Sequence, residues 1–196
     1  CTIDELENEQ VRAKIEDVNG VAKELPIKVT LFQALPKGDK METVIQKMIE
    51  LGAYEIVPVF TKRCIVKLDN KKAVSKTKRW NSIAESAAKQ SKRGIIPKVS
   101  MPVTYKEALK MAEAMDMVLI PYENAENMAH TRQVVSQIKT GMTVGIFIGP
   151  EGGFAEEEVE QAINTGAYDI TLGKRILRTE TAGMALMSVL MFETEE

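Results

Sequence analysis

The chain has few of the residues that build disulfide frameworks or metal centres, with two cysteines and one histidine in 196 residues. Cys1 and Cys64 form no Cys-x-x-Cys pair, and His130 has no carboxylates arranged to complete a zinc site with it. No apolar run approaches the roughly 20 residues needed to span a bilayer. The first residues show neither an initiator methionine nor a signal-peptide pattern. We therefore expect a cytoplasmic protein with no bound metal and no membrane association.

Acidic residues are nearly missing from one stretch of an otherwise acidic chain. Between Lys62 and Lys98 stand 12 lysines and arginines against only Asp69 and Glu85, a net charge of +10. The remainder has 14 basic and 26 acidic residues, a net charge of −12. A basic block of this kind predicts contact with a polyanion. The alternative is a lysine-rich helix face that is merely solvated.

Apolar residues recur with the periods of strands and helices in alternation. Strands are expected at 27–34, 55–60, 117–122, 143–148 and 168–172, and helices at 41–51, 71–93, 105–114, 131–139, 155–165 and 179–192. This alternation predicts an α/β fold with a mostly parallel sheet. Pro58 is expected to confine its strand to an edge or end of the sheet. The last helix is apolar nearly all round, so it is expected in the core or in a subunit interface.

The first 24 residues are more polar and too few to make a domain. From Val11 to Val18, apolar and polar residues alternate, and Asn19-Gly20 follows. This pattern predicts a strand followed by a turn.

The apolar run that ends at Ile148 stops at Gly149-Pro150-Glu151-Gly152-Gly153. These residues predict a tight loop of exposed backbone at the carboxyl end of a strand, where open α/β sheets bind ligands. The loop matches neither G-x-G-x-x-G nor a Walker A motif, and Glu151 would repel a phosphate. It suits a ligand with a positive centre, amino groups and hydroxyls, such as S-adenosylmethionine. A purely structural turn would explain the glycines nearly as well.

A second loop, Leu172 to Ala182, reads L-G-K-R-I-L-R-T-E-T-A and precedes the apolar last helix. Thr179 or Thr181, with Glu180, could cap the free N–H groups of that helix. Helix capping does not explain Arg175 and Arg178, and we interpret these two residues as facing a ligand or a phosphate.

The two loops together, I-G-P-E-G-G-F (148–154) and L-G-K-R-I-L-R-T-E-T-A (172–182), resemble those of the RsmE family of ribosomal RNA methyltransferases, members of the SPOUT class. Shorter matches at 34–42, 50–53, 61–64 and 88–93 support the resemblance, which covers the chain from about Ile27 onward. It implies a SPOUT methyltransferase domain over 25–196 with a C-terminal trefoil knot, and a homodimer with the last helix near the interface. The family has an N-terminal PUA-like, β-rich RNA-binding domain, of which residues 1–24 are expected to be a remnant.

The resemblance also implies an activity, namely methylation of N3 of a uridine in 16S ribosomal RNA of the small subunit, with uridine 1498 as the family target. S-adenosylmethionine would be held by the knotted loops. The cofactor contacts carried over by position are Leu119, Ile120, Pro121, Glu123, Ile148, Gly149, Pro150, Glu151, Gly152, Gly153, Leu172, Gly173, Ile176, Leu177, Arg178, Thr181 and Ala182.

Among these residues, Arg178 is expected to be catalytic, because it would stabilise the developing anion on uracil or hold the adjacent phosphate. Glu180 is the candidate general base, and Glu151 is expected to orient the cofactor. The residues expected to bind RNA are Lys62, Arg63, Lys89, Lys92, Arg93 and Arg175.

Two other functions are compatible with the sequence. One is a non-catalytic RNA-binding or ribosome-assembly module that keeps the fold. The other is a nucleotide-dependent α/β enzyme, against which stands the missing phosphate motif.

Overall fold

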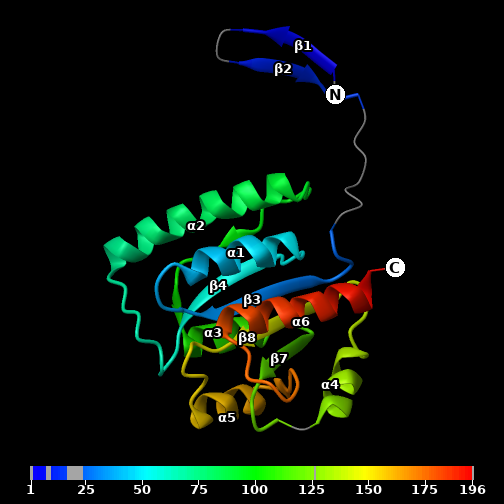
Figure 1. Ribbon diagram of the computed structural model, residues 1–196. Coiled ribbons are helices and arrows are strands. Elements are labelled where there is room, and N and C mark those ends of the chain that lie inside the picture. The colour runs from blue at the N-terminus through cyan, green and yellow to red at the C-terminus, as the bar shows by residue number, and fades with distance from the viewer. Residues whose placement is uncertain (1, 8–9, 17–23, 126, 196) are drawn as a thin grey trace.

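The computed structural model describes residues 2–7, 10–16, 24–125 and 127–195. In this part of the chain, seven parallel strands form one sheet (Figure 1). Their order across the sheet is β5, β4, β3, β8, β7 and β9, and β6 pairs with β4 next to β5. The strands are β3 (Lys28–Ala34), β4 (Glu55–Phe60), β5 (Lys98–Val99), β6 (Val103–Thr104), β7 (Met117–Pro121), β8 (Thr143–Ile148) and β9 (Tyr168–Ile170). The predicted α/β fold with a mostly parallel sheet is confirmed.

Helices cover both faces of this sheet. One face packs against α1 (Lys40–Glu50), α2 (Asn70–Gln90), α4 (Met128–Val135) and α6 (Thr179–Thr194), and the other against α3 (Tyr105–Ala112) and α5 (Glu156–Asn164). Figure 1 shows α1 and α6 running in front of β3 and β8. None of the helices formed by the described residues is long and apolar enough to cross a membrane.

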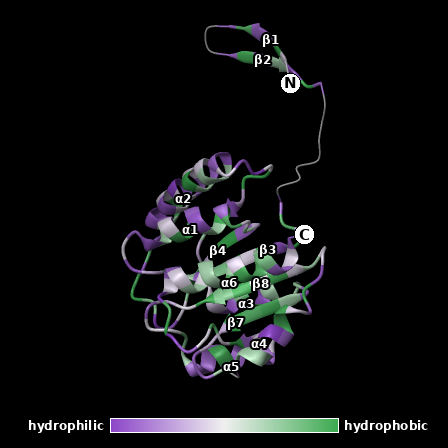
Figure 2. Cartoon of the chain, turned by 45° about the vertical axis from the view of Figure 1, so that its right-hand side comes forward, coloured by the Kyte–Doolittle hydropathy of each residue, from purple (hydrophilic) through white to green (hydrophobic). Residues whose placement is uncertain are grey.

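Burial on both faces explains why the strand sequences are continuous apolar runs. Leu31 and Ile146 belong to the core under α1 and α6, whereas their neighbours Phe32 and Phe147 belong to the core under α3 and α5. The two phenyl rings stack across β3 and β8 with their centroids 4.4 Å apart. In Figure 2 the strands are hydrophobic, while hydrophilic residues lie on the outer faces of the helices.

The position of Pro58 corrects one prediction, because β4 is not an edge strand. It pairs with β3 on one side and with β5 and β6 on the other. On the β5 side, Ile56 pairs with Val99, and the next pair is Val59 with Val103. Pro58 therefore falls in the gap between two short strands, where a missing N–H donor costs least.

The N-terminal segment forms a hairpin of β1 (Thr2–Leu6) and β2 (Val11–Lys14), paired antiparallel and exposed along its length. Part of the predicted strand at Val11–Val18 is thus present, but its partner strand was not predicted. The predicted turn at Asn19-Gly20 lies outside the described residues. That residues 1–24 are a remnant of a PUA-like domain stays a prediction.

The strand order reverses between β3 and β8. From β3 the chain continues outward to β4 and β5, whereas β7, β8 and β9 are added on the other side of β3. Parallel strands end at the same edge, so the loops that follow β3, β4, β7, β8 and β9 meet there. A switch point of this kind is where open α/β sheets place their ligands.

Candidate active site

A pocket of about 1280 Å³ opens at the carboxyl ends of the strands. Three segments build its walls, each following a strand: the loop after β7, the glycine loop after β8, and the segment from β9 to α6. Lys40 and Arg63 complete the lining. The lining residues of the three segments are Pro121–Glu123, Ala125, Asn127–Ala129, Ile148–Phe154, Thr171–Thr179 and Ala182.

The glycine loop folds back on itself as a tight turn. The N–H of Gly153 donates to the carbonyl oxygen of Pro150 at 2.9 Å, and Gly153 has a φ of +67°. A Cβ at Gly149 would lie only 3.2 Å from the backbone of Gly153 and Phe154. The loop therefore requires glycine at both its ends, and its three glycines leave backbone groups accessible in the pocket wall.

A buried polar contact joins the glycine loop to the start of α6. The hydroxyl of Thr179 donates to the carbonyl oxygen of Gly149 at 2.6 Å. The amide of Gln33, a fully buried residue of β3, donates to the same hydroxyl at 2.9 Å. Thr179 is thus not a helix cap. The N-cap of α6 is Arg178, and it makes no side-chain capping hydrogen bond.

Lys40, the first residue of α1, connects two acidic residues of the site. Its ammonium lies 2.8 Å from Glu151 Oε1 and 3.9 Å from Glu180 Oε2. The backbone N–H of Lys37 also donates to Glu151, at 3.1 Å. Partial burial would raise the pKa of Glu151, but the hydrogen bonds, led by that from Lys40, outweigh it and hold this pKa below its ordinary value of 4.5. Glu151 is therefore ionised and held against α1.

The loop after β4 docks on the other side of the glycine loop. Arg63 Nη1 donates to the carbonyl oxygen of Gly152 at 2.8 Å. The backbone N–H of Lys62 donates to the buried carboxylate of Glu158 at 2.8 Å, and Lys62 Nζ forms an ion pair with Glu157.

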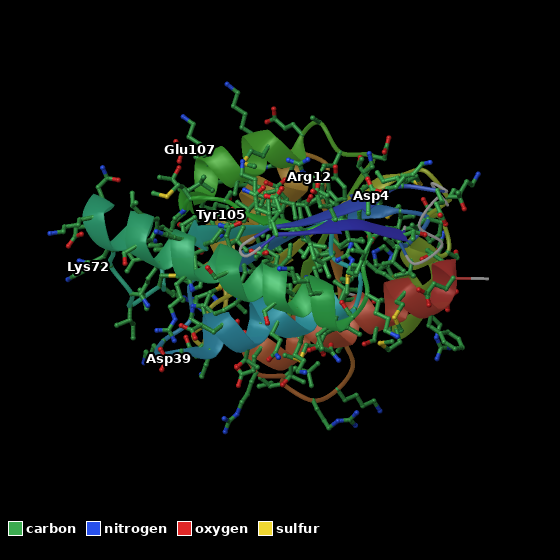
Figure 3. The ribbon with its side chains drawn as sticks, turned by 90° about the horizontal axis from the view of Figure 1, so that it is seen from above. Asp4, Arg12, Asp39, Lys72, Tyr105 and Glu107 are labelled. Atoms are coloured by element: carbon green, nitrogen blue, oxygen red, sulfur yellow. The ribbon has the colours of Figure 1, made fainter. Side chains whose placement is uncertain are left out.

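Glu158 also accepts from the N–H of Ala155 at 2.9 Å and so caps the start of α5. The backbone carbonyl oxygen of Glu158 accepts a hydrogen bond from the hydroxyl of Tyr105 at 2.6 Å. Figure 3 shows Tyr105 at the start of α3. Burial, together with the Glu158 carboxylate, raises the pKa of Tyr105. This tyrosine is a neutral donor that ties α3 to α5.

Most of the residues expected to contact the cofactor come together around the pocket. Leu119 and Ile120 do not line it, because they lie fully buried in β7. Thr181 is exposed on the first turn of α6 and also lies outside the lining. Of the two catalytic candidates, Arg178 lines the pocket, whereas Glu180 is not part of the lining and lies beside Lys40.

The residues expected to bind RNA are divided by the fold. Arg63 and Arg175 line the pocket, and Lys62 is next to it. Lys89 and Lys92 lie at the far end of α2, at the opposite edge of the sheet from the pocket.

Arg93 requires a correction, because its side chain is only 4% exposed. It pairs with Glu24 and donates to the carbonyl oxygens of Ile49 and Ala53 at 3.2 and 2.5 Å. These bonds use its guanidinium to join α1, α2 and the segment before β3. Its surroundings indicate a structural residue rather than an RNA contact.

Sequence reasoning missed three residues of the site: Gln33, Lys40 and the hydroxyl of Thr179 as a link to Gly149. Lys40 follows β3 through a short turn, Lys37-Gly38-Asp39. The rule that loops after parallel strands meet at one edge could have placed it beside the glycine loop. No sequence pattern indicates the buried Gln33.

Within the described residues, no group of three or more His, Cys, Asp or Glu side chains is placed to hold a metal ion. The polar groups of the site include backbone amides and carbonyls, three arginines, two lysines, two glutamates and the side chains of Tyr122, Asn127, Thr171 and Thr179, around a partly apolar pocket. The fold and this pocket define an open α/β domain that has its ligand site at the carboxyl ends of the strands, as α/β enzymes of this architecture do.

Comparison with known proteins identifies the family to which the chain belongs. The chain belongs to the family described as the RNA methyltransferase domain, whose profile matches residues 23–191. It is 37% identical over 198 residues to the ribosomal RNA small subunit methyltransferase E of Bacillus subtilis strain 168, covering 100% of this chain and 77% of that protein. The protein of the same name from Mesomycoplasma hyopneumoniae strain 232 is 40% identical over 161 residues, with coverages of 82% and 68%.

A solved structure extends the likeness to three dimensions. The ribosomal RNA small subunit methyltransferase E of Neisseria gonorrhoeae, bound to S-adenosyl methionine, is 35% identical with a TM-score of 0.81. The match covers 97% of this chain and 76% of that one. The resemblance to the RsmE family is thereby confirmed.

Proposed function

We propose that this chain transfers the methyl group of S-adenosylmethionine to N3 of a uridine in 16S ribosomal RNA of the small subunit, the family target being uridine 1498. The observation that carries the proposal is the pocket walled by the glycine loop and the segment from β9 to α6. The family membership, and the S-adenosyl methionine bound to the Neisseria gonorrhoeae relative, support it. An enzyme that modifies ribosomal RNA would work in the cytoplasm.

The residues of the pocket fit this cofactor. Ile148, Leu172 and Leu177 offer apolar surface for an adenine ring, and the backbone of the glycine loop and of Thr171–Gly173 offers hydrogen-bonding groups for amino and hydroxyl groups. The volume of about 1280 Å³ exceeds the roughly 300–1,000 Å³ of ordinary small-molecule sites. It leaves room for a target base beside the cofactor.

When bound, S-adenosylmethionine supplies an electrophilic methyl group on a sulfonium. The reaction breaks the methyl–sulfur bond and the uracil N3–H bond, forms the N3–methyl bond, and releases a proton and the demethylated cofactor. The chain's contribution is to position the base and to balance the charge that develops on uracil. Arg178, exposed at the start of α6 and part of the pocket wall, is our catalytic residue for this role.

The carboxylates of the site have separate roles in the proposal. Glu151, held by Lys40 and Lys37, fixes the glycine loop against α1, so that it orients the cofactor through the loop backbone rather than by direct contact. Glu180 remains the candidate base. Its Oε2 is buried and, within the described residues, has no hydrogen-bond partner. As an acceptor it could take the N3 proton only through a water or after a side-chain rotation.

The decisive experiment is methyl transfer. The chain is incubated with S-adenosylmethionine labelled in the methyl group and with small ribosomal subunits that lack the modification. Mass spectrometry of the digested 16S RNA should identify N3-methyluridine at a single position. Calorimetry should show binding of S-adenosylmethionine and of its demethylated product. Cofactor binding without transfer to either subunits or free 16S RNA would instead support a non-catalytic RNA-binding module.

The proposal includes a homodimer with α6 at its interface. The helix α6 is apolar on most sides, so not all of its apolar residues can be buried against the sheet. Phe192 and Val189 are 81% and 44% exposed. The two residues are three positions apart and so share one face of the helix, and a shared exposed apolar face of this kind would be covered by a second copy in a homodimer. Light scattering should give twice the chain mass, and Phe192→Glu should give a monomer.

The trefoil knot also remains a proposal, which rests on the resemblance to the RsmE family; in the structure, the end of β9 is held beside the segment that follows β7. The N–H of Tyr122 donates to the carbonyl oxygen of Ile170 at 2.9 Å, and the hydroxyl of Thr131 bonds both backbone groups of Thr171. The chain then passes from this sheet edge to α6, which packs on α1 through Gly183 and Met48.

A further inference from the structure

The helix α2 carries most of the basic block and divides it between the two edges of the sheet. The helix begins after the loop that follows β4, on the edge where the pocket lies, and its 21 residues span roughly 30 Å. Its far end is fixed at the opposite edge, where Arg93 bonds to Ala53, two residues before β4. Figure 1 shows the two ends of α2 on opposite sides of the domain. Only the first half of the block is therefore near the pocket.

In that first half, three lysines are exposed and have no acidic partner among the described residues: Lys67, Lys71 and Lys78. Three neighbouring cations have acidic partners, among them Lys72, which lies 3.6 Å from Asp69. Lys62 pairs with Glu157, and Arg79 pairs with Glu42 at 2.8 Å. Lys71 and Lys78 are seven residues apart, so they project from the same outer ridge of the helix, about 10 Å apart along its axis.

The placement of Lys71 is unfavourable for the helix itself. It lies in the first turn of α2, where the helix dipole favours acidic residues and disfavours cations. The first turn of α2 contains no acidic residue, as in α4, whereas α1, α3, α5 and α6 each have at least one there. The N-cap carboxylate of Asp69 accepts the backbone N–H of Lys72 at 2.8 Å and lies 3.6 Å from the Lys72 ammonium, so it serves Lys72, whereas Lys71 forms no ion pair within the described residues. Figure 3 shows the neighbouring Lys72 at this end of α2.

Apolar side chains stand among these cations. Ile65 is 68% exposed in the loop after β4, and Val74 is 55% exposed on α2 between Lys71 and Lys78. We call Ile65, Lys67, Lys71, Val74 and Lys78 the α2 strip. Cations next to apolar groups suit RNA, which offers phosphates and the faces of unstacked bases. On the other side of the loop, the acidic first turn of α5 would repel a phosphate backbone.

We propose that the RNA next to the target base leaves the pocket past Arg63 and runs along the α2 strip, with Lys67, Lys71 and Lys78 contacting its phosphates. This inference rests on the proposed function, because it takes RNA as the substrate of the pocket. It assigns the RNA contact to residues that differ from Lys89 and Lys92 at the far end of the same helix.

Two triple variants test the assignment. The first is Lys67→Gln with Lys71→Gln and Lys78→Gln. The second, which loses the same charge at the opposite edge of the sheet, is Lys89→Gln with Lys92→Gln and Lys98→Gln. Binding of a 16S ribosomal RNA fragment that contains the target uridine is measured for each over a range of salt concentrations. Methyl transfer and calorimetry with S-adenosylmethionine are measured alongside.

The first triple should lower the salt slope of RNA binding by about 2 to 3 and weaken binding about tenfold or more at 0.1 M salt. It should raise KM for RNA and leave the Kd for S-adenosylmethionine unchanged. Its thermal stability should equal or exceed that of the unaltered chain, because Lys71→Gln relieves the dipole conflict. The second triple should change RNA binding less than about twofold.

Equal losses of RNA affinity in the two triple variants, or no loss in the first, would overturn the proposal that RNA contacts the α2 strip. If the unaltered chain binds the RNA fragment but transfers no methyl group, the proposed function fails. The comparison of the two triple variants still shows whether RNA contacts the α2 strip.

Discussion

The hydroxyl of Thr179 donates to the carbonyl oxygen of Gly149 at 2.6 Å, and this bond holds the glycine loop to the first turn of α6. The two residues come from the two segments that form most of the pocket wall. Gln33 completes the contact from the centre of the sheet. The geometry of the pocket is therefore fixed by buried hydrogen bonds as well as by apolar packing.

The first prediction concerns this hydroxyl. Thr179→Val keeps the shape of the side chain but leaves the Gly149 carbonyl and one Gln33 N–H without their partner. We expect the free energy of unfolding to fall by about 1–3 kcal/mol and the Kd for S-adenosylmethionine to rise about tenfold, measured by urea denaturation and calorimetry. Thr179→Ser, which restores the hydroxyl, should recover most of the cofactor affinity. If Ser and Val variants bind the cofactor equally, the hydroxyl does not position the loop.

The second prediction concerns Arg178. Because its cation acts on charge that develops in the reaction, Arg178→Ala should lower kcat by about a hundredfold or more while calorimetry still detects S-adenosylmethionine. Lys174→Ala, which removes an exposed cation from the same loop, is the matched control and should affect kcat far less. Loss of cofactor binding in the Arg178 variant would mean that this arginine holds the cofactor instead.

The third prediction follows from the low pKa of Glu151. Because its folded-state pKa lies below 4.5, Glu151 contributes stability above that pH, and this contribution is lost as the pH falls through the folded-state pKa. The free energy of unfolding of Glu151→Gln should therefore change less between about pH 6 and about pH 3 than that of the unaltered chain. Lys40→Met should raise the pKa of Glu151, which NMR titration can follow.

A control for this titration is Glu160→Gln, which alters an exposed carboxylate of α5 that forms no ion pair within the described residues. Its pH dependence should match that of the unaltered chain. If Glu151→Gln also matches it, the Lys40–Glu151 contact contributes nothing to stability in solution.

The fourth prediction separates structural from RNA-binding arginines. Arg93→Gln breaks the pair with Glu24 and leaves two carbonyl oxygens without their donor, so the free energy of unfolding should fall by about 2–4 kcal/mol. The salt slope of RNA binding should stay unchanged. Lys92→Gln, the exposed neighbour, should leave stability within about 0.5 kcal/mol. A reduced salt slope in the Arg93 variant would restore it to the RNA-binding set.

The parts of the site that follow one another along the chain could be predicted from the sequence. The apolar run before Gly149 and the three glycines indicated a strand and a bare turn, because both patterns are local. Parallel-sheet geometry then placed that turn at the ligand edge. The two loops also carried the family resemblance, since their residues are contiguous.

The parts of the site that depend on long-range contacts could not be predicted from the sequence. Lys40 meets Glu151 across 111 positions of sequence, and Gln33 meets Thr179 across 146. Arg93 was assigned by charge clustering, which cannot show that Glu24 would cover it. Pro58 was expected at an edge because a two-residue strand such as β5 or β6 is too short to leave a period in the sequence.

Arg63 has a consequence for how the two ligands influence each other. Its guanidinium holds the carbonyl oxygen of Gly152 at 2.8 Å, and it also stands where the proposed RNA path leaves the pocket. A phosphate that draws this guanidinium outward would loosen the cofactor loop, whereas one that binds it in place would stiffen the loop. By thermodynamic reciprocity, RNA and S-adenosylmethionine must then change each other's affinity by the same factor. Under the proposed function, the sign of this coupling would depend on whether RNA weakens or strengthens one arginine–carbonyl bond.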